Sequence, residues 1–357
     1  MGYVAVKGGT NAIKASIEQL QYNRIKGGQL LEVQTILHAM KALVDQVMSE
    51  SSLYAPELAA LAIKQAEGSM EEAVFILRAH RSTLPRLHYT ETVETSQMRV
   101  SRRISASFKD IPGGQILGAT TDYTHRLLDP ELQTETHEDI LEKITKYQQT
   151  QPESENARTY PKVVDYLREQ GLFPTYQHDN SAPFDITKQS LTFPAPRSAR
   201  LQTLTRGQTG AVTSLGYASL RGYGQVHPTV GEVRVGQVPL TIAHPHYADD
   251  PYYIGEVEVT EVESFVPTTS GDTLDFEIGY GLCYGQNETK AIAMSILDQC
   301  LDHPEAPFPT HDEEFVLLHI DSVEASGFIS HLKLPHYVTF QSKLDRAREV
   351  RKEQEQS

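Results

Sequence analysis

Cysteines, cationic side chains and long apolar runs are all scarce in this 357-residue sequence. Two cysteines, Cys283 and Cys300, cannot form a disulfide framework, which favours a reducing environment such as the cytoplasm. Lysine and arginine number 32 against 47 acidic residues, and the net charge of −15 argues against a general nucleic-acid binder. No apolar stretch approaches the roughly 20 residues that a membrane span needs. We therefore expect an acidic, soluble, cytoplasmic protein without membrane insertion.

Apolar residues recur at helical spacing near the amino end, after a short strand expected at 3–6. The spacing predicts a first helix capped by Thr10, a second across residues 36–48, a third that begins at Pro56, and a fourth behind a capping box of Ser69 and Glu72. Residues 10–87 should then form a small helical subdomain.

Apolar and polar residues alternate in the second half of the chain, which is typical of strands with one buried face. The pattern is clearest at 274–283 and recurs at 232–235 and 256–259. We also expect a helix across 288–301 and a strand across 315–320. This order favours an α+β fold, with a mixed, largely antiparallel β region, over a doubly wound sheet.

Composition divides the chain into five expected units. They are residues 1–98, a strand plus helical subdomain; 99–130, a basic and glycine-rich core segment; 131–200, a variable polar linker and irregular loop; 201–340, an α+β domain; and 341–357, a charged helical tail.

A local basic segment stands out in this acidic chain. Arg102, Arg103 and Lys109 precede the glycine pair Gly113 and Gly114. Arginine side chains fit phosphate oxygens in a bidentate manner, and glycines let backbone N–H groups approach an anion. The segment therefore predicts a triphosphate or nucleotide site. A solvated basic face, or a contact with a partner chain, is the alternative.

Two further glycine-containing segments could hold a phosphate, although tight turns also explain them. In the first, Lys7 precedes Gly8 and Gly9 ahead of a helix, without the full spacing of a Walker loop. In the second, Arg221 and His227 flank a Gly-Tyr-Gly loop. Lys7, Arg221 and His227 are therefore additional candidate nucleotide ligands.

Carboxylates and histidines supply the remaining candidates. Asp110, Asp122 and Asp129 flank the basic segment, and one of them could stabilise a ribosyl cation, although caps and salt bridges are the ordinary roles of such residues. His331 and His336 could share a metal ion if the backbone between them is irregular, as the intervening proline favours. Two imidazoles underfill a zinc site, so water, a carboxylate or another chain must complete it.

Six segments, taken together and in order, resemble the I subunits of the bacterial carbon–phosphorus lyase core complex, the PhnI family. The segments are YVAVKGG at 3–9, LAALAIKQAEG at 58–68, RRISASFKDIPGGQILGATTDYTHRLLD at 102–129, RGYGQVHPTVGEVR at 221–234, GYGLCYGQNETKAIAMSILDQ at 279–299 and DEEFVLLHIDSVEASGFISHLKLPHYVTFQ at 312–341. The resemblance runs nearly from end to end, and only residues 130–200 and the charged tail diverge freely.

The resemblance implies a part in organophosphonate breakdown. With companion subunits, a member of this family replaces the adenine of its substrate ATP by a phosphonate at ribose C1′, which gives an α-D-ribose 1-alkylphosphonate 5-triphosphate. Alone, it resembles a purine nucleosidase. The implied partners are core subunits G, H and J and an ATP-binding-cassette-type subunit. The implied cofactor is zinc or another divalent transition metal at His331 and His336.

Two alternatives remain open for the sequence. The chain could be a non-catalytic scaffold or metal-site subunit of the same complex, or a stand-alone metallohydrolase centred on the histidine pair. The later carbon–phosphorus cleavage is implied to belong to a different subunit with a radical iron–sulfur centre, and two cysteines could not hold such a cluster here.

Overall fold

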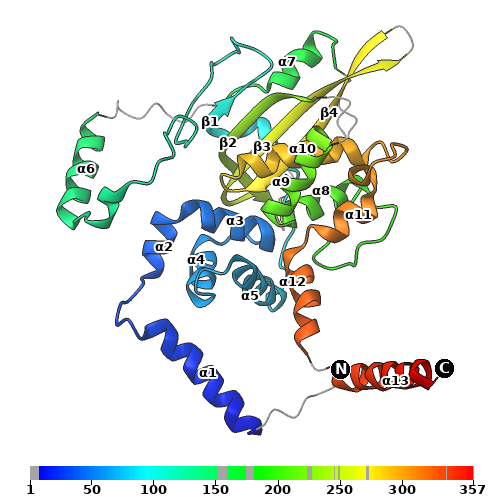
Figure 1. Cartoon of the computed structure of the whole chain (residues 1–357). Coiled ribbons are helices and arrows are strands. Elements are labelled where there is room, and N and C mark those ends of the chain that lie inside the picture. Colours follow the sequence, from blue (N-terminus) through cyan, green and yellow to red (C-terminus); the bar gives the residue numbers. More distant parts are fainter. Residues whose placement is uncertain are drawn as a thin grey trace.

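The computed structural model describes residues 8–150, 159–173, 181–222, 227–244, 246–247, 250–270, 273–334 and 336–356. This part of the chain has the α+β architecture that the sequence predicts. One four-stranded antiparallel sheet is combined with thirteen α-helices in the described ranges (Figure 1). Lys7 and the strand expected at 3–6 lie outside the described residues.

Four helices near the amino end share one hydrophobic core. They are α2 (Val33–Ala39), α3 (Lys41–Ser51), α4 (Pro56–Gln65) and α5 (Met70–Ser82). Ile36, Val47 and Leu77 are among the almost fully buried members of this core. The predicted cap of α5 is confirmed, because Ser69 Oγ accepts a hydrogen bond from the backbone N–H of Glu72 at 3.4 Å.

Two details of this helical region differ from the prediction. Thr10 does not cap the first helix, because α1 (Gly9–Ile25) begins two residues earlier than predicted, behind Gly8, whose φ of 94° suits glycine. The single helix expected across 36–48 is broken at Met40, whose φ of −121° and ψ of 40° end α2 and start α3. The break lets α2 pack against α4 while α3 packs against α5, and it leaves the Met40 side chain exposed.

The sheet combines the three strands expected in the second half with one from the basic segment. Its order is β1 (Arg99–Ile104), β2 (Thr229–Ile242), β3 (Tyr252–Ser270) and β4 (Thr273–Tyr284). Val233, Val262 and Cys283 on one face pack in a core with α8 (Arg197–Arg206), α9 (Thr209–Tyr217) and α10 (Glu288–Leu301). Helix α10 confirms the helix predicted across 288–301.

The opposite face of the sheet departs from the predicted alternation. The pattern at 232–235 predicts one buried face, but Glu232 and Arg234 are as buried as the valines between and beyond them. Helix α7 (Val163–Glu169) and the segment that follows β1 share a small core with β3 on this side. The charged side chains of the strands therefore need partners inside the protein.

One predicted strand is a helix. Residues 315–320 form most of α11 (Glu313–His319) and its end instead of a strand. Asp312 starts this helix, because its carboxylate accepts a hydrogen bond from the backbone N–H of Phe315 at 3.0 Å. Val316 and Leu317 are then buried in the core beside α8. A short apolar run does not distinguish a strand from a buried helix, and the cap decides it here.

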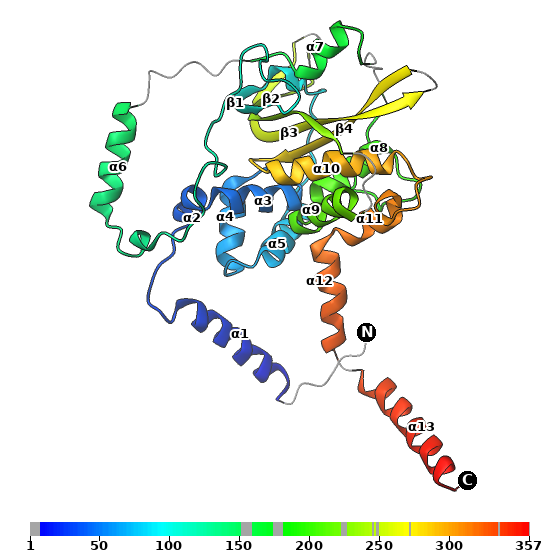
Figure 2. The same cartoon turned by 45° about the horizontal axis from the view of Figure 1, so that its top comes forward.

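Of the helices in the described part of the chain, four contribute no buried residue. They are α1, α6 (His137–Thr150), α12 (Ser322–Ser330) and α13 (Tyr337–Gln356). Helix α6 lies within the range expected as a polar linker, and α13 covers the range expected as a charged tail up to Gln356. Figures 1 and 2 show α1, α6 and α13 away from the sheet in both views, whereas α12 starts beside α5. Among the described helices, none has both the length and the apolar character needed to cross a bilayer.

Candidate functional site

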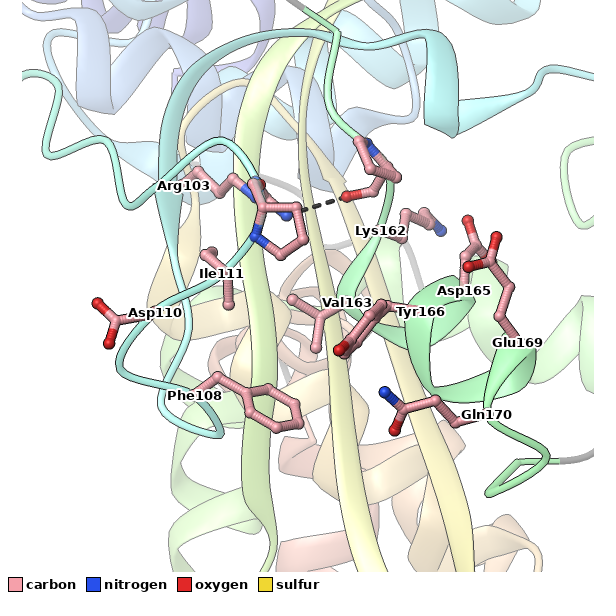
Figure 3. Close-up of a pocket in the computed structure, with 12 residues that line it drawn as sticks. Arg103, Phe108, Asp110, Ile111, Lys162, Val163, Asp165, Tyr166, Glu169 and Gln170 are labelled. Carbon is pink, nitrogen blue, oxygen red and sulfur yellow. Dashed lines mark hydrogen bonds between the residues drawn. The ribbon is translucent and has the colours of Figure 1, made fainter.

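The basic segment borders a cavity of about 600 Å³, called here the first cavity. Figure 3 shows it between the chain around Phe108 and helix α7. The side chains of Phe108, Tyr166 and Gln170 converge on this space, whereas Asp110 points away from it (Figure 3). The cavity wall also includes two acidic residues of the α7 region, Asp165 and Glu169. The residues that line the cavity therefore include three carboxylates, Asp110, Asp165 and Glu169, against two cations, Arg103 and Lys162.

Arg103 lines the first cavity, and each of its three side-chain nitrogen atoms donates a hydrogen bond within the protein. Its Nε donates to the carboxylate of Glu232, while Nη1 and Nη2 donate to the carbonyl oxygens of Pro112 at 2.5 Å and Pro161 at 2.9 Å. The side chain is fully buried, and its guanidinium lies 5.4 Å from the Tyr160 ring centroid. Arg103 therefore joins β1, β2 and both walls of the cavity.

Buried charges continue across the sheet from Arg103. Lys162 Nζ donates to Glu261 Oε1 at 2.7 Å and to Glu263 Oε1 at 3.1 Å, and Tyr280 donates its hydroxyl to Glu261 at 2.9 Å. Three cations and three carboxylates make up this set, which we call the sheet-face cluster: Arg103, Lys162, Arg234, Glu232, Glu261 and Glu263. Its charges cancel when all six groups are ionised.

Two members of the sheet-face cluster differ from the others: the Arg234 side chain lacks hydrogen-bond partners among the described residues, and Glu263 has a raised pKa. Arg234 Nη1 is 4.0 Å from Glu261 Oε2, and within the described ranges none of the guanidinium nitrogens of Arg234 makes a hydrogen bond. Burial raises the pKa of Glu263 to about 7, with the charge of Lys162 opposing the rise and that of Glu261 adding to it. Glu263 is thus a carboxyl group that can carry a proton near neutral pH.

Arg102 and Arg103 are neighbours in sequence but lie on opposite sides of the sheet, because successive strand residues alternate. Arg102 Nε donates to Glu288 at 2.8 Å, and its Nη2 donates to Asp122 at 2.5 Å. The hydrogen bond from Arg102 lowers the pKa of Asp122. The structure therefore separates the two arginines that the sequence predicts to act together, and it gives each an internal partner.

The glycine pair forms the turn that directly follows Pro112 in the wall of the first cavity. Gly113 has a φ of 85°, and a Cβ there would lie 2.2 Å from the ring of Tyr160, so only glycine fits. Gly114 follows with a φ of 75° and open space around it. Lys109 and Asp110, just before this turn, are both exposed. Lys109 is thus the member of the predicted basic set whose charge faces solvent.

The other predicted nucleotide and catalytic residues lie elsewhere. Asp129 caps the 3₁₀ turn Pro130–Gln133, where it accepts a hydrogen bond from the Glu131 N–H at 3.0 Å. Arg221 is exposed in a π-helical turn, and the exposed His227 ring lies 3.2 Å from its neighbouring carbonyl oxygen. Asp129, Arg221 and His227 do not line the first cavity.

The predicted metal histidines follow α12, on the side of the molecule away from the sheet. The rings of His331 and His336 have centroids 5.7 Å apart at an angle of 61°. His331 Nδ1 is hydrogen-bonded to the carbonyl of Phe328, and His336 Nδ1 to that of Leu334 at 2.5 Å. This arrangement leaves both Nε2 atoms for a ligand. Within the described ranges, no group of three or more metal-ligating side chains is present.

A second cavity, of about 310 Å³, contains residues that the sequence did not single out. His303 lies between two carboxylates, with Nε2 2.6 Å from Glu277 and Nδ1 3.1 Å from Glu305. The hydrogen bond with Glu277 raises the pKa of His303, and burial opposes this effect. Only spatial proximity joins Glu277 on β4 to His303 beyond α10, so no local motif could indicate the pair.

The fold and the buried charges describe an α+β protein built around an ionic sheet face. A family model of bacterial phosphonate metabolism proteins (PhnI) matches residues 2–354. The chain therefore belongs to the PhnI family, which confirms the resemblance.

Three curated relatives match the chain over almost its whole length. A putative C-P lyase subunit protein HtxH of Stutzerimonas stutzeri is 48% identical over 98% of this chain and 95% of the relative. Proteins named alpha-D-ribose 1-methylphosphonate 5-triphosphate synthase subunit PhnI from Rhizobium meliloti and Escherichia coli are both 44% identical. They cover 98% and 99% of this chain, and 95% and 99% of their own lengths.

Replacing Arg103 should destabilise the fold because it leaves Glu232 buried without its cationic partner. We expect Arg103→Ala to lower the free energy of unfolding in urea by about 3–5 kcal/mol. The combined change Arg103→Met and Glu232→Leu should recover most of this loss. Arg99 lies on the same strand as Arg103, and Arg99→Ala, which breaks its partly exposed pair with Glu256 of β3, should cost about 0–1 kcal/mol. Equal effects of Arg103→Ala and Arg99→Ala would contradict this interpretation.

His303 should titrate above the ordinary histidine range, and Glu277→Gln should bring its pKa back down. The folded-state pKa is raised, so the stabilisation from this pair is present at acid pH and is lost as pH rises through that pKa. Imidazole proton shifts in NMR spectra measure the value directly. Glu305→Gln should have the smaller effect, because Glu305 is mostly exposed. An unchanged His303 titration in Glu277→Gln would refute the pairing.

Proposed function

We propose that this chain is a subunit of a bacterial carbon–phosphorus lyase that transfers the ribose triphosphate of ATP to a phosphonate. The observation that carries this proposal is full-length similarity to relatives named as synthase subunits. Adenine leaves ribose C1′ with the electrons of the broken C–N bond, and a phosphonate oxygen forms the new bond to C1′. With water as the acceptor, the isolated chain releases adenine as a purine nucleosidase.

The reaction requires cations for the triphosphate and negative charge near the ribosyl centre. Among the predicted cations, Arg102 and Arg103 already have internal partners, so Lys109 is the one available to a phosphate. Among the predicted aspartates, Asp122 is held by Arg102, whereas Asp110 stays exposed at the first cavity. The roles of these residues in nucleotide binding and catalysis stay predictions.

We propose that His331 and His336 bind zinc or another divalent transition metal in the assembled complex. The geometry supports the proposal because a histidine ligand commonly donates its second ring N–H to a carbonyl oxygen, as both Nδ1 atoms are placed to do. Two imidazoles require further ligands, and a partner chain is the proposed source. The proposed partners are core subunits G, H and J and an ATP-binding-cassette-type subunit.

A scaffold role is the second candidate function. It is favoured by the exposed apolar side chains on helices that stand away from the sheet, including Ile17 and Leu20 on α1 and Leu141 on α6. On this alternative, the chain positions catalytic partners and performs no ribosyl chemistry.

Product analysis separates the two functions. The isolated chain incubated with ATP should release adenine and ribose 5-triphosphate, measured by chromatography. The complex given ATP and methylphosphonate should form the ribosyl phosphonate, detected by phosphorus NMR. A complex prepared without this chain is the control and should form neither product. Product formation by the complex, with no adenine release by the isolated chain, would favour the scaffold role.

Loss of the histidine pair should remove metal without removing nucleotide chemistry. We expect the double variant His331→Ala, His336→Ala to lose metal from the assembled complex while the isolated chain still releases adenine. The matched control is His319→Ala on α11, because the His319 ring also bonds a backbone carbonyl, 2.6 Å away. Elemental analysis and adenine release are measured on the same preparation. Simultaneous loss of both would mean that the metal serves the ribosyl chemistry itself.

A further inference from the structure

A third cavity, of about 390 Å³, lies where the helical subdomain meets the sheet, and we call it the seam pocket. Its wall comes from separate parts of the chain: Ser52 after α3, Tyr89 beyond α5, residues 183–187, Thr205 of α8, and Tyr284 at the end of β4. The volume falls in the range of small-molecule sites. None of the residues predicted from the sequence to bind nucleotide lines it.

Cations and an aromatic ring meet at the mouth of the seam pocket. The guanidinium of Arg86 lies 5.3 Å from the ring centroid of Tyr89, and Lys188 Nζ lies 5.0 Å from the same centroid. Lys188 also donates a hydrogen bond to the Tyr89 hydroxyl at 2.6 Å. The Arg86 side chain is 41% exposed and the Tyr89 residue 61% exposed, so both can reach a ligand.

Further arginines crowd the same place. Arg81 Nη1 donates to the carbonyl of Ser51 at 2.6 Å, next to the Ser52 wall of the pocket. Burial and the nearby charges of Arg78, Arg206 and Arg86 lower the pKa of Arg81. Asp321 pairs with Arg78 at 2.7 Å and with Arg206 at 3.3 Å, so a bound anion would add to a neutralisation of these arginines that the protein already begins.

A carboxylate inside the seam pocket offers a complementary acceptor. Asp185 Oδ1 accepts hydrogen bonds from the Thr187 backbone N–H at 2.9 Å and the Thr187 hydroxyl at 2.5 Å. Its other oxygen, Oδ2, is buried and makes no hydrogen bond within the described ranges. The nearest cation, Arg86 Nη1, is 3.6 Å from Oδ2. A sugar hydroxyl or an amino group of a ligand would satisfy this oxygen.

The seam pocket differs in charge from the first cavity. The lysine and arginine of the first cavity are held in the sheet-face cluster, and its wall includes Asp110, Asp165 and Glu169. The seam pocket instead combines exposed cations, aromatic side chains and one unsatisfied acceptor. A nucleotide presents the matching groups: phosphates, a flat base and ribose hydroxyls.

We propose that the seam pocket binds the nucleoside triphosphate of the reaction, with Arg86 in its wall and Lys188 beside Tyr89 facing the phosphates. Tyr89 supplies a stacking surface for the base, and Asp185 accepts a hydrogen bond from the ribose or the base amine. The identity of the nucleotide rests on the proposed function, whereas the location rests on the geometry of the pocket.

Equilibrium binding to the full chain tests the location. The probes are ATP, adenosine and inorganic tripolyphosphate, with the chain alone and in its complex without the ATP-binding-cassette-type subunit. Arg86→Ala should raise the Kd for ATP roughly ten- to a hundredfold, because a charge-assisted contact is lost. Tyr89→Ala should weaken ATP and adenosine but leave tripolyphosphate binding nearly unchanged. Lys146→Ala, an exposed lysine on α6, is the matched control and should bind ATP like the wild type.

Each outcome decides one of the two proposals. Wild-type affinity for ATP in both Arg86→Ala and Tyr89→Ala, or loss of affinity in Lys146→Ala alone, would overturn the seam-pocket site. A wild-type chain that binds neither ATP nor tripolyphosphate would overturn it as well. A wild-type chain that binds ATP through Arg86, in a complex that forms no ribosyl product, would support the site and refute the proposed function.

Discussion

The buried ion pair between Arg103 and Glu232 is the interaction on which the sheet and its cover depend. Moving such ions out of water costs several kcal/mol each, so removing one ion of the pair would leave the other as an uncompensated buried charge. Arg103 also bonds the carbonyls of Pro112 and Pro161. The next residue, Lys162, is bonded to β3 through Glu261. The ionic contacts therefore fix the chain that leads into α7, and with it one wall of the first cavity.

Local patterns predicted the elements whose signals lie within a few residues. The capping box before α5, the proline at the start of α4 and the apolar face of α10 are of this kind. The burial of Glu232 and Arg234 could not be predicted in this way, because alternation of charge and valine looks the same on an exposed strand. Their neighbours Arg103 and Glu261 lie far away in sequence, and only the folded sheet brings them together.

The cations of the candidate site also could not be grouped correctly from the sequence. Arg102 and Arg103 look like one cluster in sequence, but a strand places adjacent side chains on opposite faces. Arg86 belongs to no cluster in the sequence, yet the segment beyond α5 brings it into the wall of the seam pocket, and Arg81 at the end of α5 lies beside that wall. Cations that gather in space need not be contiguous in sequence. Strand β1 separates its two adjacent arginines, whereas the end of α5 and the segment that follows bring two arginines toward one place.

Helix α5 relates the seam pocket to the segment that carries the histidine pair. Asp321 caps α12, and its carboxylate also accepts two hydrogen bonds from Arg78 Nη1, at 2.7 and 2.9 Å. Arg81 lies one turn further along α5 and holds the carbonyl of Ser51 beside the pocket. The start of α12 is therefore fixed by the same helix that contributes to the pocket wall. A partner chain that completes a metal site at His331 and His336 would consequently sit in a defined position relative to the seam pocket, because α12 joins the two places.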